Sequence, residues 1–191
     1  MLAPETLFDA PAYSVERLFD VPDYEKLIEG FSVGTDAAGL EAYLKNLASG
    51  DEKANLARTY LVLDKATGEL ACYFSLRTGL ITIQVEGNDF DSLPAIELSN
   101  FATNGAYREK HKELQKLGVH IFDVFIIPIA RFMANYVGVN ALYIYALPSD
   151  RLIEHYKTMG FSRLPPEQEK FVQTHVKPKY DEGCVFMYQT L

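Results

Sequence analysis

Residues 119–138, VHIFDVFIIPIARFMANYVG, are apolar on nearly every side of a helix. A helix without a polar face must be buried, either in a protein core or in a membrane. The segment contains Asp123, Pro128, Arg131 and Asn135. A lipid-spanning helix of about 20 residues rarely tolerates such a set. We therefore expect a core helix, which Pro128 bends or divides into two abutting helices.

The size and composition of the chain fit one ordinary domain with a substantial core. The chain has 191 residues, of which 48% are hydrophobic, and this excludes a disordered protein. We expect a single domain over residues 1–191, in which residues 1–30 form an N-terminal arm packed on the rest.

The charge and the cysteines bear on partners and compartment. A net charge of −8 argues against a broad nucleic-acid-binding surface, because phosphate neutralisation needs a surplus of Lys and Arg. Cys72 and Cys184 form no framework and suit a reducing compartment. The start of the chain, MLAPETLFDA, lacks the features of a secretion signal. These features predict a soluble, cytoplasmic protein without a membrane partner.

The order of predicted elements is that of an α/β protein with a mixed sheet. We expect a helix over 35–50 that stops at Gly50, a hairpin over 58–76 with its turn at 65–68, and a strand at 80–85. A loop over 86–94, a strand over 95–104 and the core helix follow. Then come a strand over 140–147, a helix from Ser149 as N-cap to Gly160, a helix at 165–176 and a strand at 184–191.

The segment 152–161, LIEHYKTMGF, is the most specific motif. On periodicity alone it is an amphipathic helix with a buried stripe of Leu152, Ile153, Tyr156 and Met159. It also resembles the late helix of the GNAT superfamily of acyl-CoA N-acyltransferases, whose motif is aromatic-Tyr-x-x-x-Gly-Phe. Here Tyr156, Gly160 and Phe161 match, and His155 takes the aromatic position. The resemblance implies that the Tyr156 hydroxyl protonates a departing thiolate, whose thiol pKa is about 8.5.

A second stretch resembles the GNAT phosphate loop, Gln/Arg-x-x-Gly-x-Gly/Ala. The resemblance implies a coenzyme A cradle at a helix N-terminus, formed by Gln115, Lys116, Leu117, Gly118, Val119 and His120. His120 departs from the pattern, because it replaces the final small residue. The alternative is that Gly118 only separates a charged helix from a buried one. Arg108, Lys110, His111 and Lys112 either assist the phosphates or form a solvated helix face.

The strand over 95–104 would be the fourth strand of a GNAT fold. The resemblance implies that the main chain of Phe101, Ala102 and Thr103 pairs with the pantetheine arm. It also places a general base at Glu97, whose alternative role is a salt-bridge or strand-edge charge. The fold class implied is a mixed, mostly antiparallel sheet flanked by helices and splayed between the fourth and fifth strands.

Residues 31–164 are further similar to GNAT toxins of bacterial toxin–antitoxin pairs. The matching positions are Phe31, Gly34, Leu40, Tyr43, Leu44, Arg58, Thr59 and Tyr60. In that branch the acceptor is the α-amine of aminoacyl-tRNA, and an antitoxin is the protein partner.

The sequence thus predicts an N-acetyltransferase that uses acetyl-CoA and a primary amine of a small molecule or protein. Two alternatives stay open: a toxin-like enzyme acting on aminoacyl-tRNA, and a non-catalytic acyl-CoA-binding module. A homodimer and an antitoxin-like partner are both compatible with the sequence. The four histidines show no metal-ligand spacing, so no metal is expected.

Overall fold

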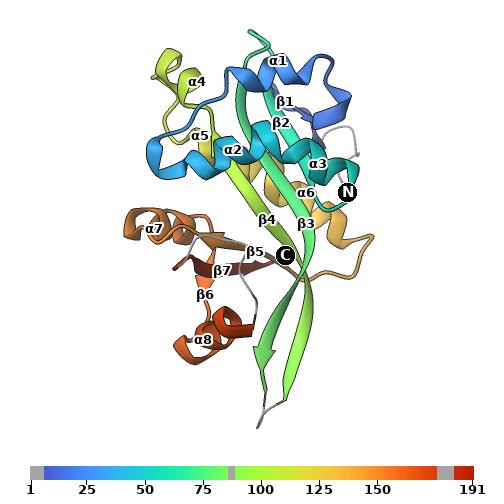
Figure 1. The fold of residues 1–191 in the computed structure, drawn as a ribbon, viewed down its shortest axis with the longest axis vertical. Helices are drawn as coiled ribbons and strands as arrows, with labels where there is room; N and C mark the ends of the chain where they lie inside the picture. The colour runs from blue at the N-terminus through green and yellow to red at the C-terminus, as the bar shows by residue number, and fades with distance from the viewer. Residues whose placement is uncertain (1–6, 86–88, 176–182) are drawn as a thin grey trace. The chain divides into compact units, whose positions relative to one another are not determined.

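The structure is a computed structural model, and it describes residues 7–85, 89–175 and 183–191. In these ranges, seven strands form one mixed sheet in the order β1-β2-β3-β4-β5-β7-β6. The strands are β1 (Tyr13–Arg17), β2 (Arg58–Asp64), β3 (Leu70–Gln84), β4 (Phe90–Thr103), β5 (Ala141–Ala146), β6 (Ser162–Arg163) and β7 (Val185–Thr190). The α-helices are α1 (Tyr24–Glu29), α2 (Ala38–Asn46), α3 (Ala48–Lys53), α4 (Gly105–Lys110), α5 (Leu117–Ile121), α6 (Ile127–Ala134), α7 (Asp150–Thr158) and α8 (Pro166–His175). The predicted α/β class with helices flanking a mixed sheet is confirmed (Figure 1).

The chain divides into two compact units. Unit 1 consists of Met1–Arg77 and Ser99–Ile129, and unit 2 consists of Thr78–Leu98 and Ala130–Leu191. The strands β3 and β4 each contribute residues to both units. The single domain over residues 1–191 stays a prediction.

Unit 1 is built on the hairpin predicted over residues 58–76. β2 and β3 pair antiparallel. In the turn, the Asp64 carboxylate accepts hydrogen bonds from the N–H groups of Ala66 (2.8 Å) and Thr67 (3.3 Å). Gly68 has a φ of +71°, which a residue without Cβ adopts at little cost. The hairpin and its turn are therefore confirmed.

The first 30 residues contribute an edge strand, which the expectation of a packed arm did not include. β1 pairs antiparallel with β2, from Tyr13 opposite Asp64 to Arg17 opposite Tyr60. Tyr13 and Val15 are buried on alternate positions. Two core positions are too short an alternation to predict a strand from sequence.

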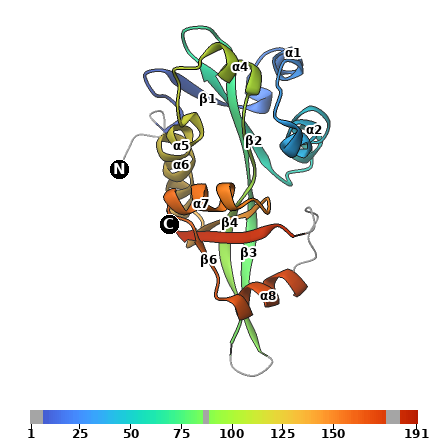
Figure 2. The same cartoon turned by 90° about the vertical axis from the view of Figure 1, so that its left-hand side faces the viewer.

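Helices α2 and α3 lie over the unit 1 strands, and α5 lies on the opposite face (Figures 1 and 2). The helix predicted over 35–50 begins with the 3₁₀ turn η3 (Thr35–Ala37) and continues as α2. Gly50 was wrongly predicted to end it, because α3 runs through this residue and the Ala54 N–H bonds to the Gly50 carbonyl (2.9 Å). One buried cluster joins helices and strands: Phe31, Leu44, Ala48, Leu61, Tyr73 and Ala102.

The predicted core helix is one continuous helix, Leu117–Ala134. It begins as α5, passes through the π-helical turn η4 (Phe122–Ile126) and continues as α6. The π turn ends two residues before Pro128, and this wider turn makes room for the proline ring and its missing N–H. Pro128 is therefore accommodated within the helix and does not break it.

This helix also has the length and composition of a membrane-spanning segment, and 44% of it is buried inside the protein. Core helices of soluble proteins pass the same test. Ile121, Phe122 and Phe125 are at most 1% exposed, so one face of the helix packs in the protein interior. This packing favours the predicted core helix, and the cytoplasmic location stays a prediction.

Unit 2 contains the parallel strand pair. β4 and β5 pair in parallel over three residue pairs, the last of which is Glu97–Tyr143. The described pairing ends there, although β4 continues to Thr103 and β5 to Ala146. Pairing that ends part-way along both strands matches the predicted splay between the fourth and fifth strands.

β4 begins earlier than predicted. It starts at Phe90, so the predicted loop over 86–94 is wrong for its second half, and residues 86–88 lie outside the described residues. The Ser92 and Thr82 hydroxyl oxygens of β4 and β3 lie 3.3 Å apart. Pro94 disfavours a strand locally, but pairing with a neighbouring strand outweighs this local preference.

Helices α7 and α8 lie on either side of β7 (Figures 1 and 2). Val172 of α8 belongs to one buried cluster with Tyr143 and Phe186, which confirms the additional helix predicted after residue 165. Ser149 is the N-cap residue of α7, as predicted, and its carbonyl accepts the Ile153 N–H (2.9 Å). The closing strand is confirmed as β7.

Candidate active site

In unit 1, the helix that follows the charged segment begins at the predicted phosphate loop. Lys116 has a φ of +59° and a ψ of +30°, and this left-handed residue turns the chain into α5. The His120 N–H makes the first intrahelical bond, to the Lys116 carbonyl (3.1 Å). The N–H groups of Leu117, Gly118 and Val119 precede that bond and have no acceptor among the described residues. Unbonded N–H groups at the start of a helix are a feature that can bind an anion.

Gly118 brings this helix N-terminus against the end of β4. A Cβ placed on Gly118 would lie 3.7 Å from Thr103 Cγ2 and 3.8 Å from Phe101 Cζ. Three predicted coenzyme-binding residues thus lie together in unit 1. Because these distances are ordinary van der Waals contacts and the φ of Gly118 is not positive, glycine is not a steric requirement here.

The side chain of His120 lies away from this contact. Its ring centroid is 6.0 Å from that of Tyr13 on β1, with an interplanar angle of 55°. Two residues along a helix correspond to a rotation of about 200°, so His120 and Gly118 lie on nearly opposite sides. The replacement of a small residue by His120 therefore places no side chain between the helix N-terminus and β4.

The other predicted coenzyme-binding residues lie in different settings. Ala102 belongs to the buried cluster under α2, so its side chain lies on the face opposite Phe101 and Thr103, and only its main chain is available to a ligand there. Gln115 and Lys116 are exposed.

The basic residues upstream of the loop divide into two groups. Lys110 and His111 both contact the carboxylate of Glu69, the residue before β3, so their side chains already have a partner. Arg108, Lys112 and Lys116 are exposed at the surface of unit 1. The alternative that these residues form a solvated helix face therefore does not fully describe Lys110 and His111, because Glu69 contacts both of them.

In unit 2, the Tyr-x-x-x-Gly-Phe motif forms the end of α7. Gly160 has a φ of +89°, and the N–H of Phe161 bonds back to the Tyr156 carbonyl (3.1 Å). The Phe161 ring is 2% exposed and packs edge-on against the Tyr156 ring at 5.6 Å. Tyr156 is half-buried, and desolvation raises its pKa to about 12. The motif thus holds a phenol that stays protonated at neutral pH.

Glu97 is 4% exposed and accepts a hydrogen bond of 2.8 Å from the Tyr143 hydroxyl. The two residues face each other across the parallel β4–β5 pair. Sequence reasoning identified Glu97 but missed Tyr143, because the register between two strands 46 positions apart leaves no local signal.

Gly79 on β3 completes this arrangement, and replacing it with alanine tests it. A Cβ at Gly79 would lie 2.1 Å from the Tyr143 hydroxyl oxygen and 2.8 Å from Cζ. The buried ring would have to move, so we expect Gly79→Ala to lower the free energy of unfolding by about 1–3 kcal/mol. Thermal unfolding measures this.

The matched control for this prediction is Gly39→Ala in α2, where nothing lies within 4 Å of the added Cβ. It should leave stability unchanged or raise it by about 0.5–1 kcal/mol. Equal stability of the two variants would mean that Tyr143 does not occupy the space over Gly79.

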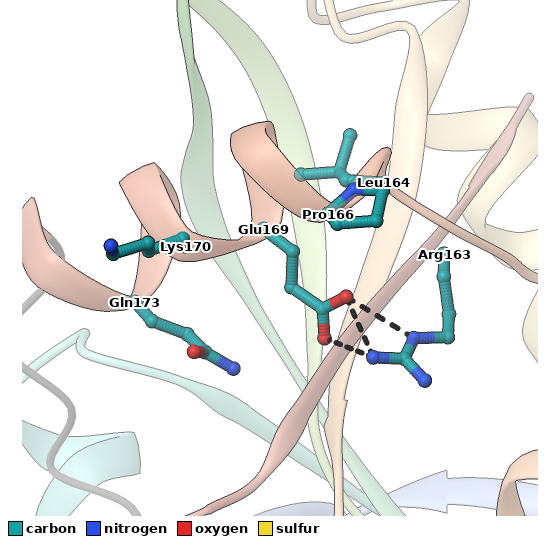
Figure 3. Close-up of a pocket in the computed structure, with 6 residues that line it drawn as sticks. All are labelled: Arg163, Leu164, Pro166, Glu169, Lys170 and Gln173. Carbon is teal, nitrogen blue, oxygen red and sulfur yellow. Dashed lines mark hydrogen bonds and ion pairs between the residues drawn. The ribbon is translucent and has the colours of Figure 1, made fainter.

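Unit 2 also has a surface pocket between β6 and α8 (Figure 3). It is lined by Arg163, Leu164, Pro166, Glu169, Lys170 and Gln173. The Arg163 guanidinium donates from Nε (3.2 Å) and Nη2 (2.7 and 2.8 Å) to the buried Glu169 carboxylate. These contacts join β6 to α8. Because Arg163 neutralises the charge of Glu169, we interpret the pair as structural and not as a reactive centre.

Neither a metal site nor a cysteine nucleophile is supported by the described residues. Among the described residues, no group of three or more His, Cys, Asp or Glu side chains could hold a metal ion. Cys72 and Cys184 are both buried and unbonded to each other, and burial raises the pKa of the Cys72 thiol well above its usual value. A buried thiol of this kind is a poor nucleophile.

The strand order, the early end of the β4–β5 pairing and the long helix after β4 define the GNAT fold. Solved structures similar to this chain share that fold. A tyrosine-to-phenylalanine mutant of KacT is 15% identical with a TM-score of 0.64, covering 94% of this chain and 95% of that chain. A mutant AtaT toxin bound to the C-terminus of the antitoxin AtaR and acetyl-CoA is 17% identical with a TM-score of 0.63, covering 94% and 93%. A KacTA–DNA complex is 17% identical with a TM-score of 0.61, covering 93% and 92%.

No protein-family model and no curated protein matches the sequence. At identities of 15–17%, the structural likeness shows the fold. The chemistry therefore rests on the residues of this chain.

Proposed function

We propose that this protein is an N-acetyltransferase that moves the acetyl group of acetyl-CoA to a primary amine. The observation that carries the proposal is the free helix N-terminus at Leu117–Val119, which Gly118 brings against Phe101 and Thr103 of β4. A solved neighbour with the same fold, AtaT, holds acetyl-CoA.

The coenzyme is bound through its pyrophosphate and its pantetheine arm. The N–H groups of Leu117, Gly118 and Val119 donate to the phosphate oxygens, and the positive end of the helix dipole adds to this attraction. The exposed Lys116 contributes a nearby positive charge. The main chain of Phe101, Ala102 and Thr103 pairs with the amides of the pantetheine arm.

The reaction is a direct attack in a ternary complex. The nitrogen of the acceptor amine forms a bond to the thioester carbonyl carbon, and the carbon–sulfur bond breaks. The amine proton passes to Glu97, directly or through water, and the sulfur leaves as a thiolate. Tyr156 donates a hydrogen bond to that thiolate.

The raised pKa of Tyr156 limits what this hydroxyl does. Burial raises the pKa of the Tyr156 hydroxyl to about 12. Complete proton transfer to a thiolate whose thiol pKa is about 8.5 would be uphill by about 5 kcal/mol. Tyr156 therefore stabilises the developing charge as a hydrogen-bond donor and keeps its proton, and the coenzyme thiolate takes up a proton from water after it is released.

Glu97→Gln tests the proposed base. Glutamine keeps the shape and still accepts the bond from Tyr143, but it takes no proton. With an acceptor amine of pKa about 10.4, the rate at pH 7 is expected to fall about 10²-fold or more. An α-amine with a pKa near 8 is partly neutral already, so its loss should be smaller. Unchanged rates together with lower thermal stability would make Glu97 a structural partner of Tyr143 instead.

The acceptor is either an amine of a small molecule or protein, or the α-amine of aminoacyl-tRNA. The net charge of −8 favours a small-molecule or protein amine, since a tRNA surface needs positive charge. The likeness to the AtaT toxin, bound to the C-terminus of its antitoxin, covers more than nine-tenths of both chains and favours the toxin-like alternative with an antitoxin as partner. For that alternative, the sequence resemblance implies aminoacyl-tRNA as the acceptor.

Two measurements test the function. The first is calorimetric titration with acetyl-CoA, for which micromolar binding is expected; no detectable binding would contradict the proposal and leave a non-catalytic module. The second is acetyl transfer to charged tRNA, polyamines, amino acids and a lysine peptide, each at low salt. Transfer to charged tRNA alone would establish the toxin-like alternative, and no transfer to it would exclude that alternative.

A further inference from the structure

The loop of residues 111–116 connects α4 to α5 and leads into the predicted phosphate loop, and one side chain contacts both of these helices. This side chain is Tyr13 of β1. The Tyr13 hydroxyl oxygen is 3.4 Å from the Tyr107 hydroxyl oxygen in α4, and the Tyr13 ring contacts the His120 ring in α5. Tyr13 is 4% exposed and Tyr107 is 2% exposed. A buried tyrosine pair therefore joins the two helices that bracket the loop.

Tyr107 is anchored in turn to the β2–β3 hairpin. Its hydroxyl donates a short hydrogen bond of 2.6 Å to the Asp64 carboxylate. Asp64 is itself immobilised, because its other oxygen accepts the N–H groups of Ala66 and Thr67 in the hairpin turn. A hydrogen bond to an ionised carboxylate is among the stronger kinds in proteins. It ties α4 to the rigid turn of the sheet.

The β2–β3 hairpin also contacts the first residue of the loop, His111. The His111 ring lies 4.2 Å from the Tyr107 ring, and its Nε2 is 3.3 Å from a carboxylate oxygen of Glu69. Lys110 pairs with the other oxygen of Glu69. Contacts to β1 and to the β2–β3 hairpin thus define where the loop starts and where α5 begins.

We propose that Tyr107, held between Asp64 and Tyr13, is a positioning residue that orients the N–H groups of Leu117–Val119 for the pyrophosphate of an acyl-CoA. The inference rests on the proposed function. Binding through fixed N–H groups requires that they point at the ligand before it arrives, since ordering them during binding lowers the affinity. Tyr107 does not touch the ligand. It acts through the placement of α4 and the loop.

The test compares one ligand that carries the pyrophosphate with one that lacks it. Acetyl-CoA carries it, and acetyl-pantetheine lacks the whole nucleotide. Dissociation constants for both are measured by calorimetry on the full chain and on Tyr107→Phe, which removes the hydroxyl and keeps the ring. The expected result is a fivefold to tenfold weaker binding of acetyl-CoA, with acetyl-pantetheine binding changed by less than twofold.

The matched control is Tyr73→Phe. Tyr73 is another buried tyrosine of unit 1, whose hydroxyl donates to the Leu40 carbonyl (2.6 Å) within the cluster under α2. Its loss should lower thermal stability without changing the affinity ratio of the two ligands. Asp64→Asn serves as a second variant: its amide oxygen still accepts from Tyr107, and a smaller effect of the same selectivity is expected.

Three outcomes would overturn the inference and leave the proposed function standing. Equal weakening for both ligands in Tyr107→Phe would make the tyrosine a general structural residue, and so would the same selective loss in Tyr73→Phe. No change for either ligand would show that the loop does not depend on Tyr107. A wild-type chain that fails to bind acetyl-CoA would instead overturn the proposed function, and this inference with it.

Discussion

Replacing Tyr156 with phenylalanine is expected to lower kcat for acetyl transfer by about 10²- to 10³-fold, the range for loss of one positioned hydrogen-bond donor to developing charge. The Phe ring preserves the edge-on contact with Phe161, so α7 and its Gly160 turn should stay intact. Only the donor to the departing sulfur is removed. The dissociation constant of acetyl-CoA should therefore change little, because the hydroxyl stabilises charge that develops only in the transition state.

Steady-state kinetics and calorimetry on the same preparations measure these two effects. Tyr188→Phe on β7 is the matched control, because it removes the hydroxyl of another half-buried tyrosine in unit 2. It should retain the wild-type kcat. A Tyr156→Phe variant with unchanged kcat would leave the amphipathic-helix interpretation as sufficient for this motif.

The second large effect is expected at Gly118, where an introduced aspartate should separate folding from coenzyme binding. A carboxylate in the first turn of a helix interacts favourably with the dipole, by about 0.3–1 kcal/mol, so the melting temperature should be unchanged or higher. The same charge would lie beside the bound pyrophosphate. Repulsion of about 2 kcal/mol is expected near a partly exposed surface, and this corresponds to roughly 30-fold weaker binding of acetyl-CoA.

Gly118→Asn is the control, because it has nearly the same size without the charge. The Cβ position meets Thr103 and Phe101 only at van der Waals distance, so a small side chain fits. The difference in acetyl-CoA affinity between the two variants should shrink at high salt. Equal affinities at low salt would mean that no anion binds at this helix N-terminus.

Much of the fold could be predicted from sequence wherever the signal is local. The turn at residues 65–68, the Gly160 stop of α7 and the apolar helix around Phe122 all have the residue types that their backbone requires. Predictions were wrong at element ends, where a single Gly or Pro is a weak signal that its surroundings can override. Helix α3 continues through Gly50, and β4 begins at Phe90 despite the nearby Pro94.

The candidate site was predictable to the same degree. Tyr156, Glu97 and Gly118 were identified from motif positions. Their partners were not, because Tyr143 reaches Glu97 through strand register and Tyr13 reaches both flanks of the loop from the other end of the chain.

The sequence by itself determined most of the segments that form helices, strands and turns, but not the edge strand β1. It also placed a glycine at a helix start and a Tyr-x-x-x-Gly-Phe motif at a helix end. Periodicity, turn residues and capping act over a few positions, so they can be interpreted one segment at a time. Only the tertiary structure decided that His120 turns toward Tyr13, that Glu97 pairs with Tyr143 over Gly79, and that Tyr107 anchors the loop to Asp64. Those contacts join residues far apart in the chain, and they exist only once the strands have paired in one register.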